Sequence, residues 1–276
     1  MNPVRVLGPE DVEAFLALTA QDPVVNVFAE FRARTTRLDP RWLGGQVVGL
    51  HRSGELVGAL HLGANLVPVG IQTDDVAAFA EAAMRARGRV STMVGRSAPV
   101  EAIWRQVGPR WDEPRDVRPG QLHMEIAGPA QVEPHPDVRR TNADDFDAVY
   151  PACVAMYTEE VGVSPELGGA AMYQTRVRQL IGRGWQFAII EGGRAIFKAE
   201  VACASPYAAQ VQGVYVVPDR RGEGLASHGM AAVAEMIRAD VAPVASLYVN
   251  AHNLSARRAY ERAGFTETAK FTTIMF

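Results

Sequence analysis

The chain has few cysteines and no long hydrophobic run. Two cysteines in 276 residues, Cys153 and Cys203, are too few for the disulfide framework that stabilises small secreted domains. No apolar run approaches the roughly 18 residues of a membrane-spanning helix. The first residues, MNPVRVLGPEDVEAF, lack the apolar core of a signal peptide. These absences predict a soluble, cytoplasmic protein that does not act in a membrane.

The chain also lacks a large net charge. With 28 basic and 31 acidic residues its formal net charge is −3, which gives no electrostatic basis for binding nucleic acid or an anionic membrane. Only Lys198 and Lys270 are lysines, a bias that we attribute to genome composition. The histidines, cysteines and carboxylates show no metal-ligand spacing, so we expect no metal site. The expected partners are small molecules or peptides.

The length and composition fit a globular protein of one large or two small domains. Hydrophobic residues make up 48% of the chain and charged residues 21%, so a sizeable core can be buried. Three prolines and few large apolar residues lie in 128–137, which predicts a linker. The predicted domains are therefore residues 1–127 and 138–276.

Both predicted domains begin with two helices and a β-hairpin and then alternate helices with strands. Turn residues separate the strands of each hairpin, Arg52-Ser53-Gly54-Glu55 in the first and Glu191-Gly192-Gly193-Arg194 in the second. Residues 96–108 also overlay residues 252–264 without a gap. A chance overlay of two α/β domains of similar length is the alternative to an internal repeat.

The most informative stretch is 211–226, VQGVYVVPDRRGEGLA. Its β-branched and aromatic residues predict a strand that Pro218 ends. Apolar residues at helical spacing from Ala226 onward predict a helix that begins near Gly222 to Gly224. The first amides of a helix have no intrahelical partner, and glycines let a ligand approach the backbone closely. This combination predicts a binding turn for pyrophosphate.

A dinucleotide-binding fingerprint is the other interpretation of this turn, because Gly222-Glu223-Gly224 is the start of a G-x-G. In that fold the turn follows the first strand, and the next strand ends in an acidic residue. Here the turn comes late, and the next strand, 245–250, ends in Asn250. The dinucleotide interpretation therefore fits less well.

Two motifs resemble those of a known family. Arg221-x-x-Gly224-x-Ala226 resembles the R/Q-x-x-G-x-G/A signature of the GCN5-related N-acetyltransferases (GNAT superfamily), and Asn253, Tyr260 and Gly264-Phe265 resemble its second signature in order and spacing. The resemblance covers the C-terminal half and implies acetyl-CoA as acyl donor. With the repeat, it implies an α/β (α+β) fold of tandem GNAT-like domains, each with a mixed, mostly antiparallel central sheet flanked by helices.

The first predicted domain resembles a degenerate copy. Ser97 and Trp104 stand where the second copy has Asn253 and Tyr260, and only Gly70 precedes the corresponding helix. We therefore expect this domain not to bind acetyl-CoA. Residues 266–276 leave little room for the two strands that often follow the family's second signature, so one strand is expected to be missing, merged or donated by the other domain.

The resemblance also assigns the cofactor contacts. In the family the central strand bulges and separates from its neighbour, which frees backbone N–H groups for the pantetheine arm and the thioester oxygen. By position these belong to Val214, Tyr215 and Val216, and Asn253 would also bind the pantetheine arm while it caps a helix. The pyrophosphate would lie on seven residues, namely Arg221, Gly222, Glu223, Gly224, Leu225, Ala226 and Ser227.

The catalytic residues are less well defined by the resemblance. Tyr260 would protonate the departing thiolate. A phenol pKa near 10 against about 8.5 for a thiol makes this transfer adverse unless the site lowers the pKa of the phenol. The family's usual base positions hold Gly213 and Tyr248 here, which leaves several candidates for the general base, namely Glu200 on the preceding strand, Glu159, Glu160, His252 or a chain of waters.

We expect an N-acetyltransferase that moves the acetyl group of acetyl-CoA directly to a primary amine in a ternary complex. Glu159 and Glu160 follow the predicted first helix of the second domain, where the family has its acceptor loop, and would favour a cationic amine. The missing base leaves an alternative, an acyl-CoA-binding regulatory protein whose catalysis has decayed.

Overall fold

In the computed structural model, which describes residues 4–276, the chain forms two compact units. The first consists of Met1–His123, Tyr248–His252 and Glu267–Phe276, and the second of Met124–Leu247 and Asn253–Thr266. The first three residues of the predicted first domain lie outside the described residues. The two units depart from the predicted ranges mainly because the C-terminal segment belongs to the first unit.

The first unit is built on a mixed sheet with the strand order β1-β2-β3-β4-β5-β12-β6. β4 and β5 run parallel, whereas the hairpin strands β2 and β3 run antiparallel. Short 3₁₀ turns lead into α1 and α4. The strands are β1 (Arg5–Leu7), β2 (Gln46–Arg52), β3 (Glu55–Leu62), β4 (Asn65–Val69), β5 (Thr92–Arg96), β6 (Asp116–Ile126) and β12 (Thr266–Met275), and the helices are α1 (Val12–Thr19), α2 (Val27–Thr36), α3 (Pro40–Leu43), α4 (Val76–Ala86) and α5 (Ser97–Val107).

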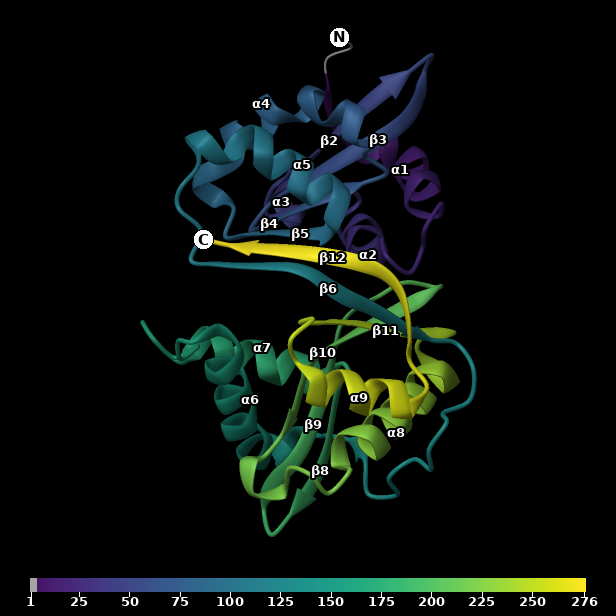
Figure 1. The fold of residues 1–276 in the computed structure, drawn as a ribbon, viewed down its shortest axis with the longest axis vertical. Helices are drawn as coiled ribbons and strands as arrows, with labels where there is room; N and C mark the ends of the chain where they lie inside the picture. Colours follow the sequence, from purple (N-terminus) through teal and green to yellow (C-terminus); the bar gives the residue numbers. More distant parts are fainter. Residues whose placement is uncertain (1–3) are drawn as a thin grey trace. The chain divides into compact units, whose positions relative to one another are not determined.

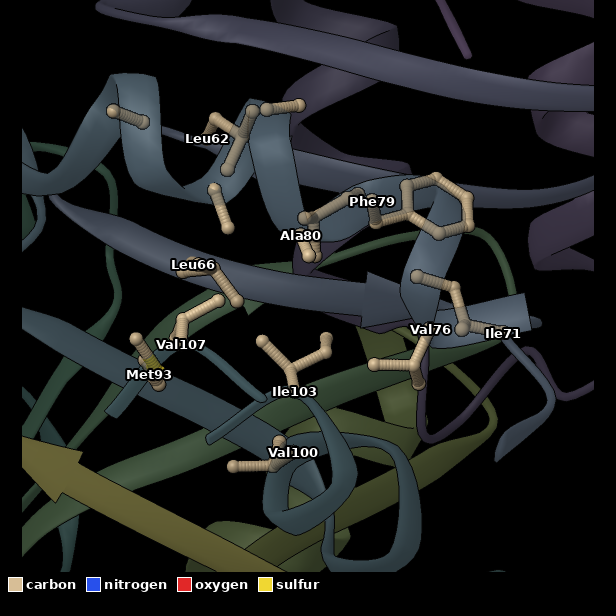
Figure 2. Packing of buried hydrophobic residues seen from close by; sticks show 14 of the residues in the cluster. Leu62, Leu66, Ile71, Val76, Phe79, Ala80, Met93, Val100, Ile103 and Val107 are labelled. Atoms are coloured by element: carbon tan, nitrogen blue, oxygen red, sulfur yellow. The ribbon is translucent and has the colours of Figure 1, made fainter. Parts of the chain in front are cut away.

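Helices cover both faces of this sheet, because side chains alternate between the faces along each strand. On β3, Ala59 packs with α1 and α2, whereas Leu60 packs with α4 and α5. Figure 2 shows the α4 and α5 side, where Phe79 of α4 and Ile103 of α5 belong to one buried cluster with Leu66 and Met93 of the sheet.

The last strand of the chain completes the sheet of the first unit. β12 pairs with β5 in antiparallel register from Phe271 opposite Arg96 to Met275 opposite Thr92. Ile274 is part of the α4 and α5 core, and the Phe276 ring packs on Trp104 and Trp111 at centroid distances of 5.6 and 5.5 Å. Residues 267–276, which were predicted to belong to the second domain, are therefore part of the first unit.

The second unit repeats the arrangement with the strand order β11-β10-β9-β8-β7. β10 and β11 are parallel, as β4 and β5 are, and the other pairs are antiparallel. Helices α6 and α7 lie on one face, and α8 and α9 on the other (Figure 1). The elements are β7 (Arg139–Arg140), α6 (Phe146–Val161), α7 (Ala171–Gly182), β8 (Gln186–Glu191), β9 (Arg194–Ala204), β10 (Ala208–Val216), α8 (Leu225–Asp240), β11 (Val244–Val249) and α9 (Leu254–Ala263). The predicted fold class of tandem α/β domains is confirmed.

The predicted linker is held against the helices of the second unit. Residues 127–138 contain no helix or strand. The Gln131 amide donates to the Ala263 carbonyl at 3.0 Å, and the His135 amide donates to the His228 carbonyl at 3.0 Å. His228 Nδ1 in turn lies 2.7 Å from the Glu133 carbonyl oxygen. This segment therefore braces α8 and α9 and does not act as a free tether.

His61 on β3 makes the stability of the first unit depend on pH. The ring is buried, with Nδ1 2.9 Å from the Asn65 carbonyl oxygen. Burial lowers the pKa of His61 from 6.5 to about 4. The histidine of the unfolded chain has the higher pKa and therefore binds a proton at a higher pH than His61 does in the folded protein. The contribution of neutral His61 to the free energy of unfolding is therefore complete above about pH 6.5 and is lost as the pH falls towards 4. The loss approaches about 3 kcal/mol at the acid end.

Replacing His61 by leucine should flatten this dependence. We expect the free energy of unfolding to fall less between pH 7 and pH 4.5, by about 2 kcal/mol, than in the unchanged protein. Urea denaturation at the two pH values measures the difference. The exposed His252, changed to leucine, is the matched control and should leave the pH dependence unaltered. An equal pH dependence in the His61 variant would contradict the assignment.

Candidate functional site

The strand β10 bulges in the middle of the second unit's sheet. Gln212 pairs with Glu200 of β9 and Tyr215 with Lys198, so that two residues of β10 lie opposite one residue of β9. Gly213 takes up the bulge with a φ of 61°, a conformation that favours glycine. β10 pairs with β11 over Ala208–Gln210, and the pairing does not extend to the bulge. The predicted bulge and separation of the central strand are confirmed.

The turn after β10 presents a row of free backbone amides. The Ser227 and His228 amides donate to the Gly224 carbonyl at 3.0 and 3.2 Å as α8 begins. Within residues 4–276, no hydrogen-bond partner is found for the amides of 222–226. Gly222 and Gly224 have φ values of 89° and 85°, and a Cβ added at Gly222 would meet nothing within 4 Å. An open cradle of N–H groups at a helix start suits a pyrophosphate.

Arg221 joins this turn to α6. Its Nη2 lies 2.8 and 3.1 Å from the two carboxylate oxygens of Glu159, and its Nε donates to the Val216 carbonyl at 3.0 Å. The guanidinium also lies over the Tyr215 ring, 5.5 Å from its centroid. A predicted cofactor residue and a predicted acceptor residue therefore form one exposed ion pair.

Glu159 and Glu160 lie in the last turn of α6, which continues to Val161. The prediction that they follow the helix is wrong, because Gly162, with a φ of 82°, is the residue that ends it.

The other charged residues of the pyrophosphate turn form ion pairs with nearby residues. Arg220 Nε lies 2.7 Å from Glu223 and its Nη1 lies 2.6 Å from Glu191.

Tyr260 lies on α9 and is 7% exposed, with its ring 6.1 Å from that of Phe265. Burial, with a further contribution from the charge of Glu160, raises the pKa of Tyr260 above the usual value of a phenol. The condition that would favour proton transfer, a lowered phenol pKa, is therefore not met in the protein alone.

Asn253 Oδ1 accepts a hydrogen bond from the Ala256 amide at 3.1 Å and thus caps α9 as expected.

Glu200 on β9 is held in a buried ion pair. Lys198 Nζ, at 0% exposure, lies 2.8 Å from one carboxylate oxygen, and Gln212 Nε2 donates to the other at 2.8 Å. Burial favours the neutral acid, but the charge and hydrogen bond of Lys198 outweigh it, so the pKa of Glu200 is lowered. A carboxylate with a lowered pKa is a weak general base. This geometry disfavours the predicted catalytic role of Glu200.

Lys198 and Gln212 were not predicted from the sequence as parts of this site. Lys198 and Glu200 are two residues apart on β9 and so share one face of the sheet. A lysine and a glutamate at this spacing in an otherwise apolar strand were the available signal.

In the described residues, no three histidine, cysteine or carboxylate side chains are grouped to bind a metal ion. No helix among them is long and apolar enough to cross a membrane.

Comparison with family models assigns the C-terminal region. Residues 178–265, from α7 through the pyrophosphate turn to the end of α9, match the acetyltransferase (GNAT) family model. Residues 45–149 match a domain of unknown function (DUF4081). No curated protein matches the chain. Residues 178–265 are therefore a GNAT acetyltransferase domain, and the N-terminal match fits a degenerate module.

Solved structures share the fold along the whole chain. A GNAT-family acetyltransferase from Colwellia psychrerythraea has a TM-score of 0.61 at 14% identity and covers 99% of both chains. A GCN5-related N-acetyltransferase from Sphaerobacter thermophilus has a TM-score of 0.63 at 16% identity, covering 98% of this chain and 94% of its own. A tandem GNAT protein from the clavulanic acid biosynthesis pathway has a TM-score of 0.58 at 15% identity, covering 98% and 97%. At these identities the likeness establishes a tandem GNAT fold.

Proposed function

We propose that the second unit transfers the acetyl group of acetyl-CoA directly to a primary amine in a ternary complex. One observation carries this proposal. The bulge near the end of β10 and a turn of unpartnered amides follow one another along the chain. The first suits the pantetheine arm and thioester, and the second suits the pyrophosphate. A cytoplasmic location, inferred from composition, belongs to the same proposal.

The chain's own residues would bind and orient the donor, which supplies an activated thioester. The amides of 222–226 would hold the pyrophosphate, and the backbone of Val214–Val216 would hold the pantetheine arm and the thioester oxygen. Tyr260, kept neutral by its raised pKa, would donate a hydrogen bond to the leaving sulfur. With Glu200 held in its ion pair, the amine's proton would leave through a chain of waters.

Release of thiol from acetyl-CoA against a panel of small amines, amino acids and peptides tests this function. We expect thiol release that depends on one class of primary amine. Tight binding of CoA with no turnover on any acceptor would contradict it. That result would favour the second candidate, an acyl-CoA-binding regulatory protein, which is supported by the lowered pKa of Glu200 and the raised pKa of Tyr260.

The acceptor is proposed to enter beside the end of α6, where two carboxylates favour a cationic amine. Replacing Glu159 and Glu160 by lysine should raise the Michaelis constant of such an amine about tenfold at low ionic strength, and less as salt screens the charges. Initial-rate kinetics at two salt concentrations measures the effect. The control changes Glu10 and Glu13 of the first unit to lysine, which alters the net charge equally. An equal Michaelis constant in both double variants would remove the end of α6 from the acceptor site.

A further inference from the structure

The Lys198–Glu200 ion pair on β9 lies next to the bulge of β10. Glu200 pairs with Gln212, the residue before the bulge, and Lys198 pairs with Tyr215, the residue after it. A Cβ added at Gly213 would lie 2.9 Å from Lys198 Nζ and 3.2 Å from Glu200 Cδ. The two charged groups are therefore packed against the backbone that bulges.

Both carboxylate oxygens of this pair are engaged inside the unit. Glu200 uses one oxygen for Lys198 and the other for Gln212, and Arg176 of α7 lies 4.0 Å from the second oxygen. Cys153 of α6 adjoins the ammonium, and the hydroxyl of Tyr173 on α7 donates to the Cys153 carbonyl at 3.0 Å. The network joins β9, β10, α6 and α7 at one point.

A fully buried ion pair adds little to the free energy of unfolding. Desolvation of two charges offsets most of their attraction, and apolar residues of similar volume often stabilise as well or better. The chain otherwise uses arginine for nearly all its basic residues, yet one of its two lysines is fully buried here. A compact ammonium fits the space beside Gly213, whereas a planar guanidinium is larger.

We propose that Lys198 and Glu200 are positioning residues for acyl transfer, which hold the bulge of β10 in the geometry that presents the amides of 214–216. Lys198 approaches the bulge itself, and Glu200 fixes Gln212 at its start. The pair acts through the backbone and not on the reacting atoms. This role explains why Glu200 lies beside the site with a carboxylate that is fully occupied. The catalytic consequence rests on the proposed function, whereas the effect on the bulge does not.

A charge-neutral double substitution of the full chain, Lys198→Met with Glu200→Leu, tests the inference. The melting temperature should stay at or above that of the unchanged protein. Amide hydrogen exchange in peptides covering Gln212–Tyr215 should become about tenfold faster. The value of kcat should fall about tenfold or more, with the acetyl-CoA KM changed by no more than about threefold, because a displaced donor weakens the transition state more than the bound substrate.

Val149→Ala is the matched control. Val149 is buried on α6, one turn before Cys153, so its truncation lowers stability without touching the ion pair. It should leave kcat and the exchange of Gln212–Tyr215 near the values of the unchanged protein. A milder pair, Lys198→Met with Glu200→Gln, keeps the contact with Gln212 and serves if the first variant does not fold.

Unchanged exchange at the bulge in either folded double variant would overturn the inference. So would a kcat within about twofold of the unchanged protein, a difference too small for a displaced catalytic donor. If the unchanged protein has no turnover, the proposed function fails, and the hydrogen exchange still decides whether the pair holds the bulge.

Discussion

Replacing Gly224 by valine is expected to weaken acetyl-CoA binding about 100-fold or more, which corresponds to two lost charge-assisted hydrogen bonds at roughly 1.5–3 kcal/mol each. Gly224 has a φ of 85°, a region that a β-branched residue avoids. Its added Cβ would also lie 3.3 Å from His228 Cδ2. The turn must therefore change shape, and the row of amides at 222–226 can no longer converge on one pyrophosphate.

Titration calorimetry of the folded variant measures this affinity. Gly193→Val is the matched control, because Gly193 in the hairpin between β8 and β9 has a similar φ of 75° and no predicted contact with the cofactor. The control should bind acetyl-CoA as the unchanged protein does. Unaltered affinity in the Gly224 variant would place the cofactor elsewhere on the molecule.

Replacing Tyr260 by phenylalanine is expected to lower kcat about 100-fold, the low end of the range for general acid catalysis. The change removes one oxygen and little volume from a buried ring, so affinity for acetyl-CoA should persist. Because burial raises the pKa of Tyr260, the phenol stays protonated beyond the usual range. The unchanged protein's kcat should therefore not fall as the pH rises to about 10 through deprotonation of this group.

Initial rates under conditions where chemistry limits turnover provide the measurement. Tyr207, an exposed tyrosine between β9 and β10, gives the control variant Tyr207→Phe, which should keep full activity. An unaltered kcat in the Tyr260 variant would reduce this residue to a packing role beside Phe265.

The local patterns of the sequence predicted most elements of the fold. The predicted turn residues 52–55 join β2 to β3 and residues 191–194 join β8 to β9, and α8 begins at Leu225, directly after the predicted helix start near Gly222 to Gly224. The short strand β4 was missed. Pro68 lies inside it, and a proline argues against a strand in a single sequence even though the structure uses it there.

Partner choice between strands could not be predicted from local pattern. The sequence placed residues 266–276 in the second predicted domain, but only the tertiary fold determines that β12 pairs with β5. At the site, the family motifs located the turn and Tyr260. The pairing of Arg221 with Glu159 depends on the end of α6 and the turn after β10 coming together in space, which spacing along the chain does not encode. The spacing of Lys198 and Glu200 places them on one face of β9, but only the tertiary fold buries that face against the bulge.

The stoichiometry of acetyl-CoA binding to the full chain tests the central claim most directly. In the described part of the first unit the segment between β4 and α4 contains one glycine, Gly70, and Trp104 lies in an aromatic cluster with Phe276 and Trp111 where the second unit has Tyr260. We therefore predict one acetyl-CoA per chain by titration calorimetry, and none in the Gly224→Val variant at the same concentrations. Two molecules per chain, or one that persists at full affinity in that variant, would contradict a single cofactor site in the second unit.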